Sequence, residues 1–224
     1  IGMANLAGVM GHERLNQTLK NFGIGEPTHI DLTAESPGEF WPIDDVNRSI
    51  SVSLGYEITM TGIQIVQAYC ALANSGKMMQ LHVVNRVVDS RNNETIFQFE
   101  PKVKRVVAGE KAVKDTVDAL KKAVAPEGTA FKAMVEGFEV CGQTGTAKKL
   151  DEGNPKRYSN HSYFAGFIGF VPADDPAFVL CIVADEPSGK SCYGGVVCAP
   201  TFSKIAEQSL RYLNVSPGMQ ANND

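Results

Sequence analysis

Apolar residues recur every three or four positions in four segments of the chain, which is the spacing of one face of an α-helix. These segments are residues 11–22, 61–76, 110–124 and 200–213. Local signals mark their ends: Gly23 follows the first segment, Thr61 and Gln64 form a capping box in the second, and Pro200 opens the fourth. We therefore predict four helices. The last is expected to bury four apolar residues, Phe202, Ile205, Leu210 and Leu213.

Shorter apolar runs and alternating positions, typical of β-strands, fill two other regions. Between residues 81 and 107 they flank a polar stretch at 89–93 that favours a hairpin turn. Further along, three apolar runs predict an antiparallel meander, at residues 138–141, 163–171 and 178–184. Residues 25–47 have no sustained period and predict an irregular crossing, in which Trp41 is more typical of a packing anchor than of a binding groove.

The composition is that of an ordinary folded domain, because 43% of the 224 residues are hydrophobic and 21% are charged. The formal net charge of −4 provides no long-range attraction for nucleic acid or anionic lipid. The basic cluster at residues 102–105 is interpreted as a solvated strand face. No apolar run reaches the roughly 18 residues that a membrane-spanning helix needs.

The five cysteines do not form a recognisable metal-binding pattern. Cys70, Cys141 and Cys181 stand in apolar runs and are expected to be buried thiols. Cys192 and Cys198 flank a glycine pair, and their spacing leaves open whether they form a disulfide or stay free. No Cys-x-x-Cys pair is present and the four histidines are scattered, which argues against a zinc site.

The most informative segment is the strand-like run that leads through Gln143 into Thr144-Gly145-Thr146. A glycine on a strand edge lets a substrate backbone approach closely, and the flanking hydroxyls can donate hydrogen bonds to a carboxylate. An outward-facing backbone N–H can stabilise an oxyanion. Because so short a motif has many accidental matches, the alternative is a plain strand that contains a glycine.

Several other segments extend this motif into a family resemblance. They stand in consistent order at residues 15–32, 51–56, 59–64, 71–76, 164–167, 193–195 and 199–202. Together with the Thr-Gly-Thr strand they resemble the corresponding passages of class B penicillin-binding proteins, in which that strand normally reads Lys-Thr-Gly. The resemblance extends from Ile1 to about Leu213.

The resemblance implies an α+β fold in which helices lie on both sides of an antiparallel sheet, as in serine β-lactamases. Residues 1–213 would form the C-terminal part of a transpeptidase domain, incomplete at its N-terminus, and residues 214–224 a flexible tail. It further implies that the backbone N–H of Thr146 lies in the oxyanion hole and that Thr144, Gly145 and Thr146 bind substrate. Gln143 then occupies the position of the family lysine.

Two motifs of that family, Ser-x-x-Lys and Ser-x-Asn, are expected outside this sequence. No Ser-x-x-Lys occurs in it, and Ser90-Arg91-Asn92 is better explained as the hairpin turn. We therefore expect a fragment of a longer parent whose nucleophilic serine lies upstream of Ile1. The chain alone is expected not to acylate, since loss of one oxyanion donor already costs roughly 2.7–4 kcal/mol.

By resemblance, the parent is a peptidoglycan D,D-transpeptidase of cell division or cell shape. It would form an acyl-serine with a stem peptide, release the terminal D-alanine and pass the acyl group to an amine, and β-lactams would trap the same serine. No metal or organic cofactor is implied. The implied partners are stem peptides, β-lactams and other cell-wall synthesis proteins, but not nucleic acid. The implied location is the extracytoplasmic (periplasmic) face of the bacterial cytoplasmic membrane, with an anchor upstream of this chain.

Other interpretations remain open. Gln143 removes a positive charge and favours a non-catalytic scaffold with the same fold. A β-lactamase or β-lactam sensor is a third reading, against which the long match over residues 56–76 argues. Lys148 and Lys149 are expected to face solvent. The Tyr193-Gly194-Gly195 segment either lines a cleft or forms a turn beside a strand edge.

Overall fold

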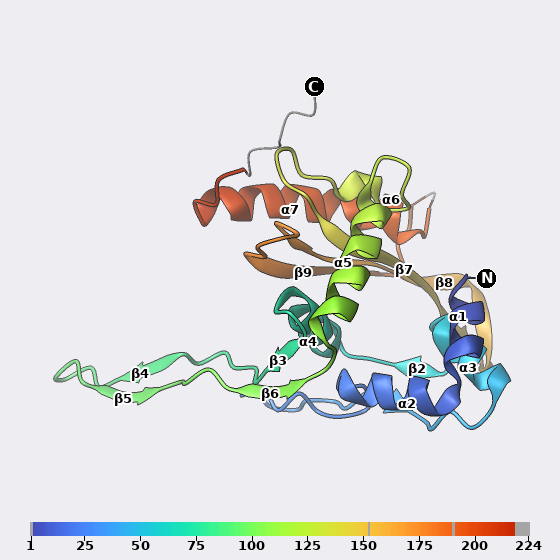
Figure 1. The fold of residues 1–224 in the computed structure, drawn as a ribbon, viewed down its shortest axis with the longest axis horizontal. Coiled ribbons are helices and arrows are strands. Elements are labelled where there is room, and N and C mark those ends of the chain that lie inside the picture. The colour runs from blue at the N-terminus through green and yellow to red at the C-terminus, as the bar shows by residue number, and fades with distance from the viewer. Residues whose placement is uncertain (1, 152, 190, 218–224) are drawn as a thin grey trace. The chain divides into compact units, whose positions relative to one another are not determined.

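The structure is a computed structural model that describes residues 2–151, 153–189 and 191–217. The chain divides into two compact units, Ile1–Gly109 and Glu110–Asp224 (Figure 1). The first unit contains α1 (Gly2–Met10), α2 (His12–Asn21), β1 (Glu39–Phe40), α3 (Val46–Ser53), β2 (Ile58–Thr59), α4 (Gly62–Ala73), β3 (Lys77–Met79), β4 (Arg86–Val88), β5 (Thr95–Gln98) and β6 (Val103–Val106). The second contains α5 (Glu110–Val124), the 3-10 helix η1 (Phe131–Ala133), β7 (Cys141–Asp151), β8 (Asn154–Val171), β9 (Phe178–Asp185), α6 (Gly194–Val197) and α7 (Ala199–Tyr212).

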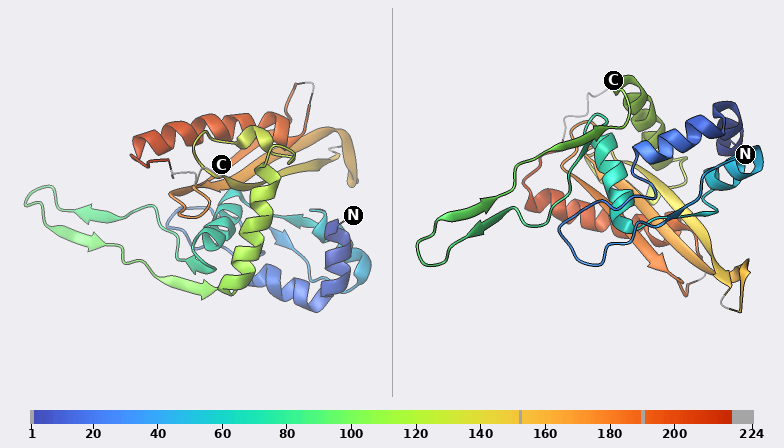
Figure 2. Two further views of the ribbon diagram at one scale, coloured as in Figure 1. Left: turned by 45° about the horizontal axis from the view of Figure 1, so that its top comes forward. Right: turned by 90° about the horizontal axis from the view of Figure 1, so that it is seen from below.

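The first unit combines helices with three small antiparallel strand pairs, β1–β2, β3–β6 and β4–β5. The β4–β5 hairpin extends away from the rest of this unit (Figure 2), and its turn includes Ser90, as the polar stretch predicted. The predicted capping box of α4 is present between Thr61 and Gln64. Gly23 has a φ of 79°, the left-handed conformation expected after α2.

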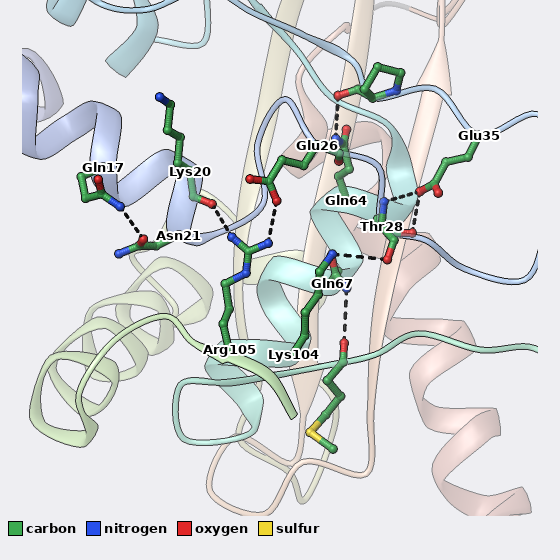
Figure 3. A network of polar contacts seen from close by, with 12 residues as sticks. Gln17, Lys20, Asn21, Glu26, Thr28, Glu35, Gln64, Gln67, Lys104 and Arg105 are labelled. Atoms are coloured by element: carbon green, nitrogen blue, oxygen red, sulfur yellow. Dashed lines mark hydrogen bonds and ion pairs between the residues drawn. The ribbon is translucent and has the colours of Figure 1, made fainter. Parts of the chain in front are cut away.

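Polar side chains hold the irregular crossing of the first unit in place (Figure 3). The buried Gln64 amide donates hydrogen bonds to the carbonyl oxygens of Glu26 (2.9 Å) and Pro37 (2.8 Å). The Glu26 carboxylate pairs with Arg105 of β6 at 2.6 Å. Since buried polar groups must be hydrogen-bonded, these contacts explain how a segment without apolar periodicity keeps a defined path.

Trp41 is not the packing anchor that the sequence suggested, because 63% of its surface is exposed. The nearby Ile43 is the buried residue, with 2% exposed. Its backbone is held by Asn16 of α2, whose side chain donates to the Ile43 carbonyl (2.7 Å) and accepts from its N–H (3.0 Å). These two hydrogen bonds between the Asn16 side chain and the Ile43 main chain fix the segment here, and the Trp41 indole remains exposed.

The second unit contains a three-stranded antiparallel sheet in the order β7–β8–β9, which is the predicted meander. Its first strand begins later than expected: β7 starts at Cys141, while Phe138 forms an isolated bridge with Val135. Helix α7 lies along one face of the sheet (Figures 1 and 2). Phe202 of this helix meets Phe167 of β8 edge to face, with ring centroids 4.7 Å apart.

The buried stripe of α7 differs from the prediction at two positions. Phe202, Ala206 and Leu210 are buried at intervals of four residues, whereas Ile205 is 38% exposed and Leu213 is 49% exposed. A repeat of four follows a single face of the helix, so Ile205 lies to one side of the packed stripe. Leu213 lies beyond the last helical residue, Tyr212.

After α7, the Val215 N–H donates to the Leu210 carbonyl at 3.0 Å, and Val215 packs against the core of this unit. Part of the predicted tail, residues 218–224, lies outside the described residues. The division into residues 1–213 and a flexible tail stays a prediction.

All five cysteines are unbonded, Cys192 and Cys198 included. Cys141 is buried as predicted, but Cys70 and Cys181 are only half-buried. Cys198 is also fully buried, which the sequence did not predict. No helix within the described residues is long and apolar enough to cross a membrane. In the same part of the chain, no three His, Cys, Asp or Glu side chains are grouped to hold a metal ion.

Mixed helices and antiparallel sheets confirm the predicted α+β class.

Candidate functional site

The predicted site residues lie on β7, whose only strand partner in the described chain is β8. The register pairs Gln143 with Ile168, Thr144 with Phe167, Gly145 with Gly166 and Thr146 with Ala165. Successive side chains of a strand point to opposite faces. Thr144 and Thr146 therefore share the face of the sheet on which α7 packs, and Gln143 lies on the other face. Gln143, Gly145 and Thr146 are exposed, and Thr144 is partly exposed.

Helix α6 begins directly against this strand. The Gly194 N–H donates a hydrogen bond to the Thr146 hydroxyl oxygen at 3.2 Å. A Cβ at Gly194 would overlap the carbonyl oxygen of Gly166 and would lie 2.7 Å from that of Gly145. Only glycine permits so close an approach. The Tyr193-Gly194-Gly195 segment thus lies beside the Thr-Gly-Thr strand, a placement that the sequence left open.

A further threonine, which the sequence did not single out for the site, lies beside the same strand. The hydroxyl oxygen of Thr129 is 3.5 Å from that of Thr144, and Thr129 is exposed. This residue stands between α5 and η1, 15 positions before Thr144. No periodicity or motif connects the two positions, so only the fold brings them together.

The nearest downstream lysines differ in their surroundings. Lys149 does not simply face solvent: its Nζ pairs with Asp185 at 2.9 Å and Glu186 at 2.6 Å, and it lies 5.0 Å from the centre of the Phe164 ring. Hydrogen bonds from Glu186 and then Asp185 raise the pKa of Lys149. Lys148 donates to Asn160 at 3.4 Å. Two carboxylates therefore neutralise Lys149, so its charge does not compensate for the uncharged side chain of Gln143.

Residues 1–207 match the family model described as "Penicillin binding protein transpeptidase domain". The chain belongs to this family. The predicted resemblance is thereby confirmed over nearly the whole sequence.

Curated relatives agree with the family assignment. The transpeptidase-family chain is 35% identical to "Stage V sporulation protein D" of Bacillus subtilis over 218 residues, covering 96% of this chain and 33% of the relative. It is 30% identical to "Peptidoglycan D,D-transpeptidase FtsI" of Escherichia coli over 222 residues, covering 97% of this chain and 35% of the relative. The chain thus spans about a third of the length of these relatives.

Solved structures share the fold. Penicillin-binding protein 3 of Mycobacterium tuberculosis in complex with aztreonam superposes with a TM-score of 0.88 at 26% identity, covering 97% of this chain and 50% of that one. The transpeptidase domain of penicillin-binding protein 3 from Burkholderia pseudomallei gives a TM-score of 0.83 at 27% identity, covering 98% of this chain and 63% of that domain. The predicted layered transpeptidase fold is confirmed by these matches.

Proposed function

We propose that the full-length protein carrying this chain is a peptidoglycan D,D-transpeptidase that β-lactams acylate. The observation that carries the proposal is the exposed Thr144-Gly145-Thr146 edge of β7, in a chain that belongs to the transpeptidase family. A relative named as a peptidoglycan D,D-transpeptidase and related structures solved with aztreonam and ampicillin support it.

In this proposal the edge of β7 binds the donor stem peptide. Nothing lies within 4 Å of a Cβ built at Gly145, so a substrate backbone can approach the strand there. The Thr146 oxygen already accepts a hydrogen bond from Gly194, which leaves its proton free to be donated to a carboxylate. Thr144 is the second hydroxyl donor, and the Thr146 N–H is assigned to the oxyanion.

The nucleophilic serine is assigned to a segment outside these 224 residues, since the sequence contains no Ser-x-x-Lys. The serine attacks the penultimate D-alanine carbonyl, the peptide bond to the terminal D-alanine breaks, and that residue leaves with a proton on its amine. An amine of a second stem then attacks the acyl-serine and restores the hydroxyl. We assign this chemistry to the extracytoplasmic side of the membrane, together with other cell-wall synthesis proteins.

A non-catalytic scaffold is the alternative function, and two observations favour it. Gln143 carries no charge, and the nearby Lys149 is neutralised by Asp185 and Glu186. Charge-assisted hydrogen bonds are roughly twice as strong as neutral ones, so carboxylate capture at this strand is weakened. The scaffold would keep the fold of the β7–β9 sheet without turnover.

Intact-mass spectrometry of the full-length protein after incubation with benzylpenicillin tests these alternatives. A transpeptidase gains the mass of one benzylpenicillin, because ring opening adds the whole molecule to the serine. The 224-residue chain treated in parallel is the control and gains no mass. A folded full-length protein that stays unmodified would overturn the enzyme and favour the scaffold.

A further inference from the structure

Thr129 occupies a position that its neighbours fix firmly. Before it, the Gly128 N–H donates to the Ala125 carbonyl at 2.7 Å, and after it the Ala130 N–H donates to the Ala123 carbonyl at 2.8 Å. The Ala130 side chain is fully buried. On the other side, a Cβ built at Gly195 would overlap the Thr129 carbonyl oxygen, so α6 approaches this residue backbone to backbone. The exposed hydroxyl is therefore presented from a well-anchored main chain.

The same contacts orient the neighbouring Thr144. Its methyl carbon lies 3.4 Å from the point that a Cβ added to Gly195 would occupy, which is a van der Waals distance. The methyl group is therefore the part of Thr144 directed toward α6. Its hydroxyl lies 3.5 Å from that of Thr129. Hydroxyl–hydroxyl hydrogen bonds are usually about 2.7–2.8 Å long, so this contact commits neither proton firmly. Both hydroxyls remain able to donate to a ligand.

Resting on the proposed function, we propose that Thr129 is a further substrate-binding residue, whose hydroxyl donates with that of Thr144 to the carboxylate of the donor peptide or β-lactam. A carboxylate accepts hydrogen bonds through two oxygens, and two donors 3.5 Å apart suit one such group. The site thereby gains a neutral donor next to the strand on which Gln143 has replaced a cation.

Two variants separate the effect of the Thr129 hydroxyl from the effect of its side-chain shape. Thr129→Val keeps a β-branched side chain without the hydroxyl, and Thr129→Ser keeps the hydroxyl. Rates of acylation of the full-length protein are measured with benzylpenicillin and with its methyl ester, in which the carboxylate charge is lost. We expect Thr129→Val to slow acylation by the acid about tenfold, because a hydrogen bond to a charged group is lost. Acylation by the ester is expected to slow less than about twofold. Thr129→Ser restores the preference for the acid.

Thr116→Val is the matched control, because the Thr116 hydroxyl is exposed on α5 and bonds its own helix at the Ala112 carbonyl. Thermal midpoints within about 2 °C of wild type establish that the variants are folded. Equal slowing of acid and ester by Thr129→Val, or no slowing of either, overturns the role of Thr129 while leaving the transpeptidase intact. A wild type that neither compound acylates overturns the proposed function and this inference with it.

Discussion

At the scale of single residues, the proposed function gives the uncharged side chain of Gln143 a role in how strongly the donor carboxylate is bound. Gln143 is exposed on β7, and the charge of the nearby Lys149 is neutralised by Asp185 and Glu186. A hydrogen bond to a charged group contributes about 1.5–3 kcal/mol, against about 0.5–1.5 kcal/mol for a neutral pair. We predict that Gln143→Lys accelerates acylation of the full-length protein by benzylpenicillin roughly five- to tenfold, measured from the rate of adduct formation.

Gln98→Lys serves as the matched control for that substitution. Gln98 is exposed on the β4–β5 hairpin, so the same change of net charge is made away from the strand. An equal acceleration by both variants would mean that overall charge steers the anion. No acceleration by Gln143→Lys would mean that this position does not contact the carboxylate.

The buried thiol of Cys141 leads to a prediction about how the stability of the fold depends on pH. Burial raises its pKa from 9.0 to about 12, although the charge of Lys121 opposes this. Because the folded-state pKa is raised, the thiol's contribution to stability is complete below pH 9 and is lost as the pH rises from 9 toward 12. We predict that the free energy of unfolding in urea falls less steeply over this range for Cys141→Ala than for wild type. Cys192→Ala is the control, and identical slopes for all three proteins would contradict the prediction.

At the scale of elements, the start of α6 determines the shape of the β7 edge. Gly194→Ala would drive a methyl group into the carbonyl oxygens of Gly166 and Gly145, and backbone cannot move aside as a flexible side chain can. We predict that this variant displaces α6 and breaks the hydrogen bond to Thr146. Acylation of the full-length protein by benzylpenicillin, measured from the rate of adduct formation, is then expected to slow at least tenfold. Gly8→Ala is the control, because nothing lies within 4 Å of its Cβ position in α1. Wild-type rates for Gly194→Ala would show that α6 does not shape the site.

Elements were predicted well where local chemistry determines them. Helix α5 runs over the predicted residues 110–124, because its apolar stripe and charged face define it without help from elsewhere. The capping box at Thr61 also needs only contacts three residues apart. Ile205 was misjudged, because the helical period does not say how wide the covered stripe is. Thr129 was missed for a related reason: its approach to Thr144 depends on the packing of α5, η1 and α6.

At the scale of the whole molecule, the two units differ in the size of their hydrophobic clusters. In the first unit, Ala71, Met78 and Val107 form a small buried cluster. In the second, a cluster of thirteen buried residues includes Phe167, Phe202 and Leu210. Burial of apolar area is the main favourable term in folding, and stability can differ between parts of one chain.

We therefore predict that the first unit loses protection from amide hydrogen exchange at lower urea concentration than the second. Peptides from α4 and β8 report on the two units in one mass-spectrometric experiment. Met78→Ala and Phe202→Ala are matched probes, since both side chains are fully buried, and truncation costs about 2–5 and 3–5 kcal/mol. Each is expected to lower protection chiefly in its own unit. Simultaneous loss in both units, with either variant acting equally on both, would show instead that the 224 residues unfold as one cooperative body.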